Sequence, residues 1–125
     1  MMQLEDLLKQ YKQKERNVKD LYYVCSPLSS KQSYKVIVNM SKAKMYEEMV
    51  EKKFNCRAIA PHSFLPRYLN DNIPEERQIA LDFGISVLSV CKKIVVCGDV
   101  ISSGMAAEIK YAEEHGIDII YLKDV

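Results

Sequence analysis

The chain lacks the short motifs that mark several large enzyme classes. No GxGxxG follows its first apolar segment, and its 125 residues contain no GxxxxGK[ST] loop. GxSxG and HExxH are also absent. These absences argue against a dinucleotide-binding domain of the usual type, a P-loop nucleoside triphosphatase, a hydrolase with a nucleophile elbow and a zinc protease.

Cysteine is present but not in a pattern that binds metal. No CxxC pair occurs, and no Cys/His spacing typical of a zinc site. The four cysteines are Cys25, Cys56, Cys91 and Cys97. We therefore expect reduced, mostly buried thiols in a cytoplasmic protein, with no metal and no cofactor.

Neither charge of one sign nor a long apolar run dominates the chain. The formal net charge is +1, and 48% of residues are hydrophobic. No segment approaches the length of a membrane span, and the first residues include Glu5 and Asp6 instead of the apolar centre of a secretory signal. We expect one globular domain that binds neither nucleic acid nor membrane.

Apolar runs and helical periodicity alternate along the chain. The predicted strands are residues 21–25, 57–60, 94–97 and 117–122. The predicted helices between them are residues 34–54, 74–91 and 105–115. Alternation of this kind predicts an α/β fold of three layers, with helices on both faces of a parallel sheet of order 2-1-3-4.

An additional amphipathic helix is predicted at the N-terminus, over residues 1–19, ahead of the α/β domain at 20–125. Leu4, Leu7 and Leu8 share one face of it. This face can pack on the domain or on a partner subunit, and it leads us to expect a homo-oligomer.

Three loops are predicted to meet at the carboxyl edge of the sheet, where ligands of such folds bind. The segment 98–108 is the most informative, because a strand, a Gly/Ser loop and a helix start form a site for an anion or a polyol. The candidate ligand-binding residues of the three loops are Ser26, Pro27, His62, Gly98, Asp99, Ser102, Ser103, Gly104 and Met105.

Glu108 is the candidate catalytic carboxylate. Its helical neighbours Met105 and Ala112 are apolar, so it borders the buried stripe and can act on a ligand held by the preceding loop. The alternative is an acid that only complements the helix dipole. Tyr23 and Asp82 are the other catalytic candidates; their alternatives are a sheet aromatic and a solvated helical acid.

Taken together, these segments resemble the nucleoside 2-deoxyribosyltransferase-like superfamily, and most closely its small bacterial and phage branch. The similarity covers about residues 20–122. Its segments are Tyr23–Leu28, Ala60–His62, Glu76–Arg77, Val95–Asp99 and Ser102–Ile109. The Ser-x-Gly-x-x-x-Glu element within the last of these is the most specific.

The resemblance implies a flavodoxin-like sheet and a ligand made of a base, a sugar and often a phosphate. It implies that Glu108 attacks the anomeric carbon, that Tyr23 orients it, and that Ser102 with the backbone of Ser103–Gly104 holds a phosphate or sugar oxygen. Three features depart from the family pattern. Lys92–Lys93 replaces an acid, Asp82 lies three residues from the expected register, and Ser26–Pro27 replaces a glycine.

The sequence thus favours a protein that binds a nucleoside, nucleotide or related ribosyl ligand and cleaves or transfers at its N-glycosidic bond. One alternative is a non-catalytic protein of phage type that senses or sequesters a nucleotide-like signal. A second is an interaction domain whose pocket is vestigial. Turnover, saturable binding and absence of binding distinguish the three.

Overall fold

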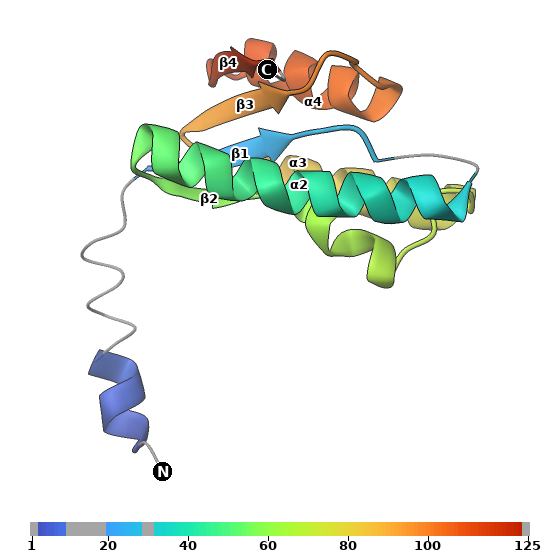
Figure 1. The fold of residues 1–125 in the computed structure, drawn as a ribbon. Coiled ribbons are helices and arrows are strands. Elements are labelled where there is room, and N and C mark those ends of the chain that lie inside the picture. Colours follow the sequence, from blue (N-terminus) through green and yellow to red (C-terminus); the bar gives the residue numbers. More distant parts are fainter. Residues whose placement is uncertain (1–2, 10–19, 29–31, 124–125) are drawn as a thin grey trace.

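The computed structural model describes residues 3–9, 20–28 and 32–123. Its strands form one parallel sheet of order β2-β1-β3-β4, as the sequence predicted (Figure 1). The strands are β1 (Leu21–Cys25), β2 (Arg57–Ile59), β3 (Lys93–Cys97) and β4 (Asp118–Leu122). Central strands β1 and β3 are buried on both faces, which is why their sequences are apolar almost without interruption.

Helices cover both faces of the sheet. The α-helices beyond residue 20 are α2 (Ser33–Phe54), α3 (Pro74–Leu88) and α4 (Ser103–Glu114), and two 3₁₀ turns, η1 (Pro61–Ser63) and η2 (Leu65–Arg67), follow β2. Alternate residues of β1 point to opposite layers. Tyr22 and Val24 pack under α2, whereas Tyr23 and Cys25 pack with residues of α3 and α4.

Local signals set the ends of these helices. Asn55 adopts the left-handed conformation (φ 51°) and ends α2, while Pro74 fits the first turn of α3. Ser102 caps α4, so this helix begins two residues earlier than the predicted Met105. Helix α3 ends at Leu88, three residues before the predicted Cys91. Both differences lie at helix ends, where periodicity gives the least information.

The N-terminal helix is described only in part. Residues 4–9 are helical and exposed, and most of the predicted helix over 1–19 lies outside the described residues. None of the described helices is long and apolar enough to span a membrane. The described residues also contain no group of three potential metal ligands among His, Cys, Asp and Glu.

Candidate functional site

A buried carboxylate lies beneath the start of α4. The side chain of Glu108 is in the second turn of this helix, and the residue is only 4% exposed. Its Oε2 accepts a hydrogen bond from the hydroxyl of Tyr23, and its Oε1 lies 3.7 Å from the Sγ of Cys25, whose thiol donates to it. Both partners come from β1, so the strand holds the carboxylate from below.

Burial sets the acidity of this group. It raises the pKa of Glu108 to about 7, although the hydrogen bonds from Tyr23 and Cys25 act in the opposite direction. Burial and the Glu108 charge raise the pKa of Tyr23 well above its usual range, so its hydroxyl stays a donor. Near neutral pH the carboxyl is therefore divided between its acid and its base form, which suits either proton transfer or nucleophilic attack.

A glycine in α3 permits this arrangement. A Cβ atom added at Gly84 would lie 2.9 Å from the Tyr23 hydroxyl oxygen and 3.1 Å from Oε2 of Glu108. Both distances are shorter than ordinary contacts to a side-chain carbon. Glycine is unfavourable inside a helix, by about 1 kcal/mol relative to alanine, so close approach to the pair explains its presence here.

A cavity opens above Glu108 at the carboxyl edge of the sheet. Its volume is about 30 Å³, which is room for roughly one or two water molecules. Its wall combines Tyr23, Gly84 and Glu108 with Ser102 and Gly104 at the start of α4. The opposite wall is the segment with η1 and η2, which contributes His62, Leu65, Pro66 and Leu69.

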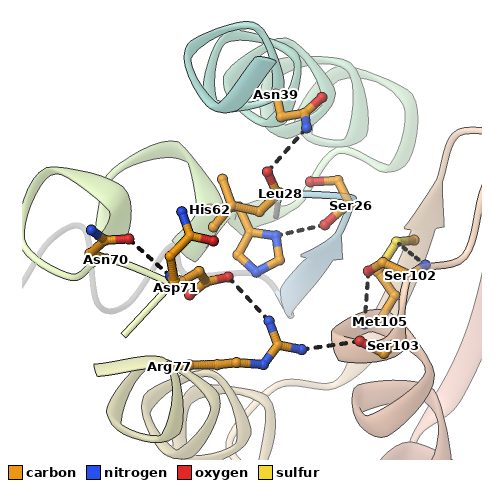
Figure 2. Close-up of polar contacts among 11 residues, drawn as sticks. Ser26, Leu28, Asn39, His62, Asn70, Asp71, Arg77, Ser102, Ser103 and Met105 are labelled. Atoms are coloured by element: carbon orange, nitrogen blue, oxygen red, sulfur yellow. Dashed lines mark hydrogen bonds and ion pairs between the residues drawn. The ribbon is translucent and has the colours of Figure 1, made fainter. Parts of the chain in front are cut away.

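His62 is fixed by the backbone of β1's carboxyl end. Its Nδ1 lies 2.6 Å from the carbonyl oxygen of Ser26, which can only accept, so Nδ1 carries the proton (Figure 2). Burial lowers the pKa of His62, although the bond to Ser26 and the charge of Asp71 oppose this. The ring is therefore neutral near pH 7 and presents Nε2 as a hydrogen-bond acceptor.

Arg77 joins three elements around the cavity. It extends from α3, with Nη1 3.6 Å from Oδ2 of Asp71 and Nη2 donating to the hydroxyl of Ser103 at 3.0 Å (Figure 2). Asp71 and Arg77 both contribute to the cavity wall. The guanidinium thus lies beside the N-terminus of α4, where an anionic group of a ligand would meet two favourable charges.

Residues at the start of α4 form its N-terminal cap. The hydroxyl of Ser102 accepts a hydrogen bond from the backbone N–H of Met105, and the N–H of Ser102 points to the Met105 sulfur at 3.5 Å. Met105 itself is fully buried in the core below the helix. It supports the loop from beneath and does not line the cavity.

The structure brings only some of the predicted site residues together. Tyr23, His62, Ser102, Gly104 and Glu108 line the cavity together. By contrast, three predicted ligand-binding residues line a separate hollow of about 190 Å³ beside α2. These are Pro27, Gly98 and Asp99, while Ser103 and Met105 line neither hollow.

Ser26 and Asp82 also lie outside the cavity wall. Ser26 is buried beneath it and contacts His62 through its backbone, while its hydroxyl has no hydrogen-bond partner among the described residues. Asp82 is exposed on α3 and accepts a hydrogen bond from Gln78 at 2.8 Å. The position of α3 nearest to Glu108 is occupied by Gly84, so this helix brings no carboxylate to the pair.

Two residues of this site, Gly84 and Asp71, were not singled out by sequence reasoning, and Arg77 entered only as part of the segment Glu76–Arg77 in the family resemblance. A lone glycine in a helical pattern signals a close contact but does not name it. Asp71 precedes α3 in a polar loop, and only the tertiary fold brings it to the cavity.

Comparison with known proteins gives a family. Residues 20–122 match the family described as domain of unknown function DUF7768. The chain belongs to this family. No curated protein matches it in sequence.

A solved structure shares the fold of this DUF7768 member. It is the 2-deoxyribosyltransferase of the psychrotolerant bacterium Bacillus psychrosaccharolyticus, at a TM-score of 0.58 and 16% sequence identity. The alignment covers 82% of this chain and 72% of that one. The similarity establishes a common flavodoxin-like α/β architecture, as the resemblance in sequence implied.

Proposed function

We propose that this DUF7768 protein binds a nucleoside, nucleotide or related ribosyl ligand at the Glu108 cavity and cleaves or transfers at its N-glycosidic bond. The observation that carries the proposal is the buried Glu108 carboxylate, held by Tyr23 at the base of a cavity on the ligand-binding edge of the sheet. The fold shared with a 2-deoxyribosyltransferase supports the choice of ligand class.

The proposed step is nucleophilic substitution at the anomeric carbon. An oxygen of ionised Glu108 forms a bond to that carbon, and the carbon–nitrogen bond to the base breaks. Its electron pair leaves with the base, which takes up a proton from solvent water. Water or a second base then attacks the same carbon, releases Glu108 and returns one proton to solvent. Tyr23 keeps the carboxylate oriented through both steps.

Polar groups of the wall suit the rest of such a ligand. Nε2 of His62 accepts from a sugar hydroxyl, and the guanidinium of Arg77 with the N-terminus of α4 favours an oxygen or a phosphate. The cavity is much smaller than a nucleoside. Binding of a whole nucleoside therefore requires the cavity to widen.

A second candidate is a protein that binds such a ligand without turnover. The position of Asp82 favours it, since this carboxylate is exposed on α3 and bonded to Gln78 instead of facing Glu108. Besides Glu108, the acid that lines the wall is Asp71, and its carboxylate is paired with the Arg77 guanidinium at 3.6 Å.

One experiment distinguishes the two candidate functions. The protein is incubated with a panel of ribo- and deoxyribonucleosides and their 5′-monophosphates, and released base is measured by chromatography. A thermal-shift screen of the same panel detects binding. Released base supports glycosidic chemistry, a thermal shift without product supports the binder, and the absence of both refutes a ribosyl ligand from this panel.

A further inference from the structure

A third hollow lies on the far side of the η1–η2 segment. It is a groove of about 1080 Å³ between α2, β2 and the 3₁₀ turns. Its apolar lining includes Leu21, Ile37, Met40 and Phe64. Ile37 is 64% exposed and adds to the apolar part of this lining.

The groove is closed to a peptide that would add as a strand. The outward N–H groups of the edge strand β2 and of the residue after it donate to carboxylates of α2. Ala58 donates to Glu51 at 3.3 Å, and Ala60 donates to Glu47 at 3.2 Å. Because these donors are already bonded, a strand added there would gain few main-chain hydrogen bonds, which favours an occupant recognised through its side chains, as a helix is.

The lining of the groove has a small excess of positive charge, because Lys44, Arg57 and Arg67 outnumber Glu47 and Glu51. Both arginines are exposed. The two lining carboxylates, Glu47 and Glu51, accept from backbone N–H groups, and Glu47 also pairs with Lys44 at 3.1 Å. A helix with an apolar face and acids beside it is complementary to this surface.

The chain contains such a helix. Residues 4–9 expose Leu4, Leu7 and Leu8 at a spacing that places them on one face, at 70%, 49% and 49%. Glu5 and Asp6 are exposed on the same turns. Figure 1 shows this helix apart from the sheet and its flanking helices.

We propose that residues 4–9 of a second copy of this chain occupy the groove, so that two chains exchange their N-terminal helices. The groove runs beside α2 from Ile37 to Glu51, which is roughly 21 Å of helix, whereas residues 4–9 need about 9 Å. Residues 10–20 can span about 36 Å when extended. Two identical exchanges form a closed dimer.

Light scattering on the full-length protein tests the exchange. We expect a mass of twice 14.4 kDa at tens of micromolar. Changing Leu4, Leu7 and Leu8 together to Ser, or Ile37 to Asp, should raise the dimer dissociation constant by about tenfold or more. The matched control is Val90→Asp, because Val90 is 73% exposed but does not line the groove.

The remaining outcomes each overturn the proposal. A monomeric wild-type protein excludes exchange, and hydrogen exchange then shows whether the helix protects the groove of its own chain. A dimer that survives the triple Ser change uses another surface.

A charge test adds specificity: Arg57→Glu with Arg67→Glu should weaken the dimer, and adding Glu5→Lys with Asp6→Lys should restore it. Failure of restoration excludes the proposed charge pairing.

Discussion

The hydroxyl of Tyr23 donates a hydrogen bond to the carboxylate of Glu108, across a sequence separation of 85 residues. The bond links the central strand β1 to the second turn of α4 at the edge where this fold binds ligands. Gly84 of α3 covers the pair closely. A buried acid held by donors from β1, with a pKa near neutrality, is thus the centre of the candidate site.

Glu108→Gln tests the nucleophile. The amide keeps the shape of the side chain but cannot attack an anomeric carbon, so turnover should fall on the order of a thousandfold or more while ligand binding persists. In the wild-type protein, kcat/KM should rise with pH and level off above about 7, where Glu108 is ionised. Turnover by the variant at the wild-type rate would exclude Glu108 as nucleophile.

The same substitution changes how stability depends on pH. Glu108 has a pKa of about 7 when folded and about 4.5 when unfolded, so the native state binds the additional proton between these values. The free energy of unfolding should therefore decrease as pH rises from 4.5 to 7, by about 3 kcal/mol from this group. Urea titrations of the wild-type protein and of Glu108→Gln measure this contribution as a difference in the free energy of unfolding. The opposite contribution of His62 is present in both proteins and cancels. A constant difference across that range would contradict the assignment.

Tyr23→Phe removes the donor but keeps the ring. The hydrogen bond from Tyr23 lowers the pKa of Glu108, so its loss should move that pKa upward from about 7. Stability should fall by about 1–3 kcal/mol at high pH, where the carboxylate is ionised and has lost a partner. The carboxyl carbon signal of Glu108 in an NMR titration reports the pKa. Tyr22→Phe is the control, because Tyr22 packs on the opposite face of β1.

Gly84→Ala should destabilise the protein although alanine favours helices. Its Cβ would press on both oxygens of the pair, and the expected net cost is about 1–3 kcal/mol. Gly104→Ala is the matched control, since a Cβ there lies 3.7 Å from Cδ2 of Leu81, an ordinary contact. Thermal unfolding compares the two. Equal stability of both variants would show that α3 can move away at no cost.

Asp71→Asn and Asp82→Asn test the roles of two acids, of which Asp71 lies in the loop before α3 and Asp82 lies on α3 itself. Asp71 lines the cavity and pairs with Arg77, so its change should alter ligand affinity several-fold. Asp82 is exposed and bonded to Gln78, and its change should leave affinity and turnover as they were. Isothermal calorimetry and the base-release assay measure both. Loss of turnover in Asp82→Asn alone would restore it as the catalytic acid.

The sequence by itself determined the order of elements and the parallel sheet. The spacing of apolar residues in Ile94–Cys97 and along α2 reflects the backbone repeat of a strand and of a helix. Because crossovers between parallel strands are right-handed, few strand orders are then possible. It also pointed to Glu108, because Met105 and Ala112 on either side showed which face of α4 is buried.

Only the tertiary structure decided which loops share a wall. Asp99 and Gly98 follow β3 directly but open beside α2, while Ser102, a few residues later, faces α3. Gly84, Asp71 and Arg77 reach the cavity because α3 packs on the Tyr23 side of the sheet. Such contacts join residues distant in sequence, and no local period encodes them.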